Sequence, residues 1–396
     1  MTDLKQLALD QAEEIRDETA SLCRYIHAHP ELGFHEVQSS RAIKEMLERH
    51  GFQVTMGVGG LDTAFRAEAD SGKPGPVIGF LCEYDALPEI GHGCGHNIIG
   101  SASAAAAIAA LASAKKAGGK IVAIGTPAEE GGGGGKERLL EAGVMDDLDC
   151  AMMSHPGPWT SVGGTSLANQ ALRFIFYGKA AHAAAMPERG ASALEAVIQM
   201  FNQINALRTF LPADSRVNGI ITKGGTAPNI IPDHCEAVFN IRSDSRAGLK
   251  ALIERVTHCA EAGALGSGCT VEIEPAGIRY DEIIPNTVLA KRLEANLNLL
   301  GEAIDQTTPG RPLASTDLGN VTHRLPAFQA MFRVSDGRPI PHSAEFTDAC
   351  GGENGANLAV RISRVLSCVA ADLLEHPEYI RQAKEELYQK TIGENK

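Results

Sequence analysis

The sequence has no surplus of basic residues. Of its 396 residues, 36 are lysine or arginine and 49 are aspartate or glutamate, so the net charge at pH 7 is −13. This balance disfavours nucleic acids and anionic membranes as partners, although a local cationic pocket could still hold an anion. The sequence also lacks any run of eighteen apolar residues, and we therefore expect no membrane-spanning helix.

Regular cysteine spacing is absent as well. The nine cysteines are an odd number and follow no short repeat, which argues against a disulfide framework and is typical of a reducing compartment. The first residues, MTDLKQLALDQAEEIRDE, are acidic and helical in pattern and lack the basic start and apolar stretch of a secretory leader. We therefore expect a cytoplasmic protein.

Alternating helices and strands are the main pattern of the first half. Apolar spacing predicts helices over residues 3–28 and 40–50, and alanine, the best helix former, predicts a buried helix over 101–114. Three short apolar runs, 77–88, 121–130 and 148–158, each end in a polar cluster. In an α/β sheet the ligand site lies beyond the carboxyl ends of the strands, where these clusters fall.

The pattern changes at about residue 168. Residues 168–283 combine strand-like alternation with two amphipathic helices, and the α/β alternation returns from about 284. A chain of this length is too long for one ordinary core. We predict an α/β domain of residues 1–167 and 284–396, into which an α+β domain of residues 168–283 is inserted.

The loop GHGCGHN, residues 91–97, carries Cys94 and His96 between a predicted strand and a helix. A thiolate and an imidazole so placed can direct two ligand atoms at one metal ion. A flexible turn with incidental polar residues is the alternative. A dinucleotide-binding loop is excluded, because the third glycine of that pattern falls on His96.

The segment GTPAEEGGGGGK, residues 125–136, places Glu129 and Glu130 at a predicted strand end. One carboxylate can bind a metal ion while its neighbour takes a proton from water. A solvated surface pair is the alternative. A phosphate-binding loop is excluded, because its first glycine would be Glu130 and its terminal hydroxyl residue would be Glu137.

His155 ends the third apolar run, where a lone histidine is more often a hydrogen-bonded structural residue. A single sheet would bring it to the same edge as the cysteine, histidine and glutamates of the other two clusters. Chance convergence of five such side chains is improbable, so the residues alone predict a metal site.

Several segments, taken together, closely resemble family twenty of the metallopeptidases, and within it subfamily D. In the first half they are HAHPELGFHE (27–36), CEYDALP (82–88), HGCGHN (92–97), PAEEGGGGGKERLLEAG (127–143) and SHPGP (154–158). Later segments that fit in order are GKAAHAAAMPERGASALEAV, GGTAPNIIPDHCEAVFNIRS, STDLGNVTHRLP and PHSAEF. The resemblance implies a zinc-peptidase-like catalytic domain, with a mixed sheet flanked by helices, and an inserted ferredoxin-like lid domain that forms a homodimer.

Carried over residue by residue, the resemblance implies two divalent metal ions per chain, zinc or manganese, with cobalt a further possibility. The implied metal ligands are Cys94, His96, Glu130, His155 and His342. Glu129 would be the general base and proton shuttle, and Asp85 would orient a metal ligand. Glu83 stands where the wider family often has histidine, and Cys94 where it has a carboxylate. A thiolate favours zinc, whereas carboxylates and imidazoles also accept manganese or cobalt.

In the inserted domain the resemblance implies roles for three residues. His182 would act in the site of the other subunit and polarise the scissile carbonyl, while Asn229 and Arg242 would hold a substrate carboxylate, which suits the bidentate geometry of arginine. The implied reaction is metal-dependent hydrolysis of an amide bond in a small N-acyl amino acid or dipeptide with a free carboxylate. Aminoacylase-like, indole-acetyl-amino-acid, p-aminobenzoyl-glutamate and β-alanyl-dipeptide hydrolases belong to this branch.

Two other interpretations remain open. His27 and His29 could be the metal pair of a barrel-type deaminase, but such a pair stands at a strand end, and here it follows a long helical pattern. A non-catalytic binding protein on the same fold is the second possibility. The presence of Glu129 and His182 argues against it.

Overall fold

The computed structural model describes residues 1–306 and 314–392, and these divide into two compact units. The first unit contains Met1–Thr165 and the described residues from Ile283 to 306 and from Asp317 to 392. The second contains Ser166–Glu282 and a short segment that ends at Thr316. Each unit has its own hydrophobic core.

A six-stranded sheet forms the centre of the first unit, in the order β1-β2-β4-β3-β5-β10. Its strands are β1 (Gln53–Met56), β2 (Phe65–Asp70), β3 (Val77–Cys82), β4 (Lys120–Gly125), β5 (Cys150–Gly157) and β10 (Ala327–Arg333). Strands β3, β4, β5 and β10 run parallel, whereas β2 is antiparallel to β4 and β1 is antiparallel to β2. The sheet is therefore mixed, as predicted, and β3, β4 and β5 end at one edge.

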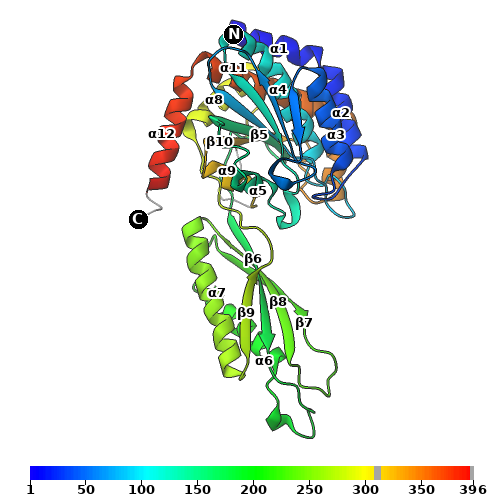
Figure 1. The fold of residues 1–396 in the computed structure, drawn as a ribbon, viewed down its shortest axis with the longest axis vertical. Coiled ribbons are helices and arrows are strands. Elements are labelled where there is room, and N and C mark those ends of the chain that lie inside the picture. Colours follow the sequence, from blue (N-terminus) through cyan, green and yellow to red (C-terminus); the bar gives the residue numbers. More distant parts are fainter. Residues whose placement is uncertain (307–313, 393–396) are drawn as a thin grey trace. The chain divides into compact units, whose positions relative to one another are not determined.

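Helices cover both faces of this sheet (Figure 1). The helices are α1 (Asp3–Glu14), α2 (Arg16–Ala28), α3 (Val37–Arg49), α4 (His96–Ala117), α5 (Gly135–Glu141), α8 (Thr287–Leu299), α9 (Leu318–Thr322), α10 (Ala344–Cys350), α11 (Gly352–Glu375) and α12 (Glu378–Ile392), with 3-10 turns η1 (Val58–Gly60) and η2 (Glu130–Gly132). Successive strand residues point to opposite faces. Phe80 accordingly belongs to the core under α2, α3, α4 and α11, and Leu81 to the core under α5 and α9.

Helix α4 is the central helix of the larger core and connects β3 to β4. By length and composition alone it could cross a membrane, but 94% of its most apolar stretch is buried inside the unit. Its alanines, such as Ala105 and Ala106, are fully buried, and their small side chains let α11 and the sheet approach closely. It is the buried connecting helix that the alanine-rich stretch predicts.

The second unit has a four-stranded antiparallel sheet in the order β7-β8-β6-β9. Its elements are β6 (Ala168–Tyr177), η3 (Pro187–Arg189), α6 (Ala193–Arg208), β7 (Arg216–Lys223), β8 (His234–Ser243), α7 (Arg246–Gly266) and β9 (Thr270–Pro275). Helices α6 and α7 pack on one face, where Phe174, Phe176 and Phe239 are buried. The order β-α-β-β-α-β is the ferredoxin-like arrangement predicted for the insert.

Gly100 lies where α4 approaches the end of β3, and its replacement by alanine tests whether this close approach is required. A Cβ there would lie 2.7 Å from the carbonyl oxygen of Glu83 and 3.1 Å from Cδ1 of Ile43. Alanine gains helix propensity over glycine, by about 1 kcal/mol. We nevertheless expect Gly100→Ala to lower the free energy of unfolding by about 1–3 kcal/mol, because the helix must move off the strand.

Urea unfolding followed by the fluorescence of Trp159, the sole tryptophan and a residue of the first unit, measures this loss. Gly337→Ala is the control, since a Cβ there would meet only Ser335 Oγ at 3.8 Å. An unfolding midpoint for Gly100→Ala equal to that of the control would show that the close approach is not required.

Candidate metal centre

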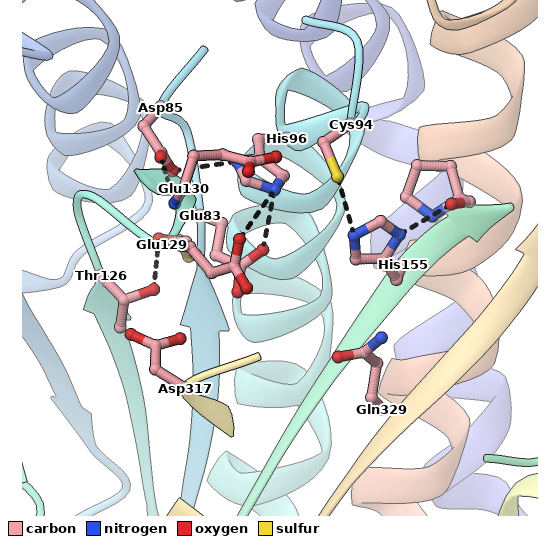
Figure 2. Close-up of polar contacts among 12 residues, drawn as sticks. Glu83, Asp85, Cys94, His96, Thr126, Glu129, Glu130, His155, Asp317 and Gln329 are labelled. Atoms are coloured by element: carbon pink, nitrogen blue, oxygen red, sulfur yellow. Dashed lines mark hydrogen bonds and ion pairs between the residues drawn. The ribbon is translucent and has the colours of Figure 1, made fainter. Parts of the chain in front are cut away.

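Metal-type side chains from the segments that follow β3 and β4 and from β5 converge in the first unit (Figure 2). His342, from the loop between β10 and α10, joins them. Three sets of ligand atoms lie within 4.8 Å of one another: Cys94, His96 and His155; Cys94, Glu130 and His342; and His96, Glu129 and Glu130. The structure therefore brings together all five predicted metal ligands and the predicted base. The parallel order of β4, β3 and β5 explains the convergence, because the chain leaves each strand at the same edge.

Gly95 allows Cys94 and His96 to share one site. It has φ +77 at the N-terminus of α4, and a Cβ there would lie 2.4 Å from Cγ of Pro156. Glycine adopts this conformation without steric cost. The same loop holds His342, whose backbone N–H donates to the carbonyl of Gly93 at 2.8 Å.

Asp85 fixes two predicted ligands at once. One of its oxygens accepts a hydrogen bond from Nδ1 of His96 at 2.9 Å, and the other accepts from the backbone N–H of Glu130 at 3.0 Å. Burial would raise the pKa of Asp85, but His96 and the Glu130 N–H outweigh it and keep the pKa below its usual range. The contact requires a proton on Nδ1 of His96, and it orients the ring so that Nε2 faces the cluster.

The donor atoms of the cluster fit a cation. Nε2 of His96 is buried and makes no hydrogen bond within the described part of the chain, and it faces carboxylate oxygens of Glu83 at 3.4 Å and Glu129 at 4.0 Å. His155 donates from Nδ1 to the carbonyl of Pro156 at 2.7 Å, which leaves its Nε2 3.5 Å from Sγ of Cys94. Oε1 of Glu130 lies 3.3 Å from Nε2 of His342. Imidazole, thiolate and carboxylate groups so gathered are ligands that zinc and other divalent transition metals accept.

The two adjacent glutamates have opposite electrostatic environments. Burial, together with the facing carboxylates of Glu83 and Glu130, raises the pKa of Glu129 well above its usual range. Burial would also raise the pKa of Glu130, but a hydrogen bond to His342 and the charge of His96 hold it below its usual value. Two carboxyl groups whose pKa values are pushed apart are suited to different roles, one as an ionised ligand and one as a proton carrier.

A buried ion cluster that the sequence analysis missed lies beside the site. The ammonium of Lys136 is fully buried, 2.5 Å from Oε1 of Glu83 and 2.5 Å from Oδ1 of Asp317. Burial would lower the pKa of Lys136, but the two carboxylates raise it above its ordinary value. Glu83 thus has one oxygen on Lys136 and the other 3.4 Å from Nε2 of His96. A lysine and an aspartate 181 residues apart give no sequence signal that they pair.

Two of the three predicted residues of the second unit lie side by side. His182 follows β6 and is exposed, and its Nδ1 accepts from the backbone N–H of Ala185 at 3.1 Å. The next residue, Ala183, donates its N–H to the carbonyl of Asn229 at 3.0 Å.

Arg242 lies at the other end of the same sheet. It pairs with Asn169 near the start of β6, whereas His234 pairs with Tyr177 at the end of β6, from which the chain continues to His182. The eight steps from 169 to 177 span about 26 Å at about 3.3 Å per residue. Within one chain, Arg242 therefore does not contact the same small molecule as His182. The half-buried Arg242 has no ion-pair partner in the described part of the chain, and burial lowers its pKa.

The alternative metal pair is not formed. Nε2 of His27 lies 2.9 Å from the carbonyl oxygen of Thr347, and Nδ1 of His29 lies 2.7 Å from that of Tyr25. Within residues 1–306 and 314–392, neither histidine belongs to a group of metal-type side chains.

Comparison with known proteins agrees with these observations. Residues 169–267 match the family model of a peptidase dimerisation domain. Xaa-Arg dipeptidase of Homo sapiens is 35% identical to this chain and covers 97% of it and 93% of its own length. A p-aminobenzoyl-glutamate hydrolase chain of Escherichia coli is 33% identical and covers 91% of this chain and 76% of its own length.

A solved structure from Bacillus subtilis, described as a dinuclear metal-binding peptidase of the M20 family, has a TM-score of 0.68. It covers 92% of this chain and 99% of its own at 22% identity, and so supports the fold. The identities of the curated relatives, over nearly the whole chain, decide the family. This chain belongs to family twenty of the metallopeptidases, M20, and is a metal-binding hydrolase of amide bonds.

Proposed function

We propose that this enzyme hydrolyses the amide bond of a small N-acyl amino acid or dipeptide that carries a free carboxylate. The observation that carries the proposal is the set of His96, Glu129 and Glu130, whose ligand atoms lie within 4.8 Å of one another. It unites candidate metal ligands with a buried carboxyl group that can carry a proton. The two relatives are named Xaa-Arg dipeptidase and p-aminobenzoyl-glutamate hydrolase. Both names denote substrates in which an amide bond links an amino acid to an acyl group or to another amino acid.

We assign two divalent cations per chain to ligands Cys94, His96, Glu130, His155 and His342. The thiolate favours zinc, and the imidazole and carboxylate ligands also accept manganese or cobalt. Bound cations supply positive charge that favours deprotonation of water and stabilises negative charge on the substrate carbonyl oxygen.

Glu129 is the proposed proton carrier. One of its carboxylate oxygens accepts the proton of the attacking water and then delivers it to the leaving nitrogen. Burial raises the pKa of Glu129, which suits a group that must both accept and return a proton. Asp85 keeps His96 oriented throughout, because its hydrogen bond to Nδ1 fixes the ring.

Glu129→Gln tests this role, because glutamine keeps the shape of the side chain and cannot take the proton. We expect kcat to fall by about 10²- to 10⁴-fold, with the metal content per chain unchanged. The substrates are N-acetyl amino acids, dipeptides ending in arginine, and p-aminobenzoyl-glutamate. Glu141→Gln, at an exposed position of the same segment, is the control. A Glu129→Gln enzyme with wild-type kcat would exclude Glu129 as the base.

We further propose a homodimer in which His182 and Asn229 of one chain complete the site of the other. The separation of His182 from Arg242 along the sheet supports this arrangement, because the two side chains of a single chain lie too far apart to contact one small substrate. Arg242, half-buried and lacking an ion-pair partner among the described residues, is suited to a substrate carboxylate. Asn229 and Arg242 would then reach a given substrate from different chains.

Mixing two inactive variants tests the shared site. Glu129→Gln and His182→Asn are each expected to be inactive alone. In a hybrid dimer, the His182→Asn chain has an intact Glu129 and receives His182 from its partner, so one of two sites is complete. Random subunit exchange then restores about a quarter of wild-type activity.

The double variant Glu129→Gln/His182→Asn, mixed with either single variant, is the control and should restore nothing. If His182 served its own chain, no hybrid would contain a complete site. Mixtures that stay inactive after demonstrated subunit exchange would therefore refute the shared site.

A further inference from the structure

The segment HAHPELGFHE, residues 27–36, has no part in the proposed chemistry, yet its second half contacts both loops that carry the metal centre. The backbone carbonyl of Glu31 accepts from the N–H of Ala86 at 2.8 Å, next to Asp85, and Leu32 forms a parallel bridge with the same residue. The side chain of Glu31 accepts from the backbone N–H groups of residues 38 and 39 at the start of α3. The 31–36 segment is therefore anchored to a helix and to the loop that follows β3.

Glu36 connects this segment to the second loop. Its side chain is buried; one oxygen accepts from the backbone N–H of Ala128 at 2.9 Å, and the other accepts from the hydroxyl of Thr63 at 2.8 Å. Ala128 directly precedes Glu129. A buried carboxylate is costly unless donors satisfy it, so both of these contacts matter to its placement.

Ala128 has a conformation that needs such support. Its φ is +54, in the left-handed region that alanine rarely adopts. A Cβ on Gly33 would lie 2.8 Å from Cβ of Ala128, and a Cβ on Gly133 would lie 2.7 Å from it. Ala128 thus lies between Gly33 of the 31–36 segment and Gly133 of the glycine run. Its backbone N–H donates a hydrogen bond to Glu36.

We propose that Glu36 and Gly33 are positioning residues that, through Ala128, set where Glu129 and Glu130 stand relative to His96. The inference rests on the roles proposed above for these two glutamates. The backbone of residues 128–130 is then held by two buried carboxylates, since Glu36 accepts from Ala128 and Asp85 accepts from Glu130. The hydrogen bonds of the Glu36 carboxylate go to Thr63 and to the backbone of Ala128, and not to a predicted metal ligand, so the proposed effect passes through the backbone.

A set of substitutions separates positioning from general stability. Glu36→Gln retains an acceptor for the Ala128 N–H, and its amide NH₂ can donate to Oγ of Thr63. Glu36→Leu removes the acceptor. Thr63→Val removes the other contact of the same carboxylate and leaves the one to Ala128, so it is the matched control for loss of a buried hydrogen bond.

The first readout is amide hydrogen exchange at Ala128 in the metal-free full-length enzyme, which does not depend on activity. We expect exchange about tenfold faster in Glu36→Leu, as loss of one buried hydrogen bond allows, and wild-type exchange in Glu36→Gln and Thr63→Val. The second readout is zinc affinity by chelator competition. We expect it to be about 10- to 100-fold weaker in Glu36→Leu only, as for loss of a group that orients ligands.

Gly33→Ala gives a second test that leaves every hydrogen-bonding group in place. Its Cβ presses on Ala128 and should reproduce the effects of Glu36→Leu, whereas Gly164→Ala, where a Cβ meets nothing within 4 Å, should behave as wild type. If Glu36→Leu does not fold, Gly33→Ala decides the question.

Wild-type exchange at Ala128 and wild-type zinc affinity in the folded variants would overturn the inference. A Thr63→Val variant whose zinc affinity falls as much as that of Glu36→Leu would also overturn the inference. Failure of the proposed function would be a different result, namely an active Glu129→Gln enzyme. That result would not change the hydrogen-exchange rates expected at Ala128.

Discussion

The buried carboxylate of Asp85 joins the loop after β3 to the loop after β4, and the geometry of the metal centre depends on this link. It accepts from Nδ1 of His96 and from the backbone N–H of Glu130, and so orients one ring and one chain segment together. A charge buried without such donors would be strongly destabilising. The hydrogen bonds from His96 and Glu130 therefore stabilise the buried charge of Asp85, and the same hydrogen bonds hold these two predicted metal ligands in place.

Excess negative charge is the second constraint on this region. The single positive charge of Lys136 offsets only part of the charge of Glu83 and Asp317, and Glu129 and Glu130 add two further carboxyl groups beside them. The neighbouring carboxylates raise the pKa values of both Glu129 and His96, so these two groups hold protons more tightly than they would in water. Divalent cations would replace those protons, which is the usual coupling of metal binding to proton release.

The sequence predicted the strands that carry the site because their apolar runs are short and end in polar residues. The strands stop at Cys82 and Gly125, earlier than the predicted segments, because the chain leaves the sheet where the polar cluster begins. The helix predicted over residues 3–28 is broken at Ile15, which has φ −96 and ψ 11. The apolar spacing continues through the break, since both halves pack against α4 and α11, and so it could not reveal the break.

The predicted metal ligands could be found because most of them lie in short motifs, in which metal-binding side chains are close together in the sequence. Lys136 and Glu36 were missed because their roles arise only when distant segments meet: Glu36 contacts Ala128 across 92 residues, and Lys136 contacts Asp317 across 181. The separation of His182 from Arg242 depends on the register of β6 against β8, and alternation of polar and apolar residues leaves shifts of two residues open.

The central claim is that the converging side chains hold a pair of metal ions. Elemental mass spectrometry of untagged protein, after chelation and reloading with zinc or manganese, tests it most directly. We expect about two ions per chain, and a loss of both in His96→Ala, because His96 belongs to two of the three ligand groups. Protein that binds no metal after reloading, or a His96→Ala variant with full metal content, would contradict it.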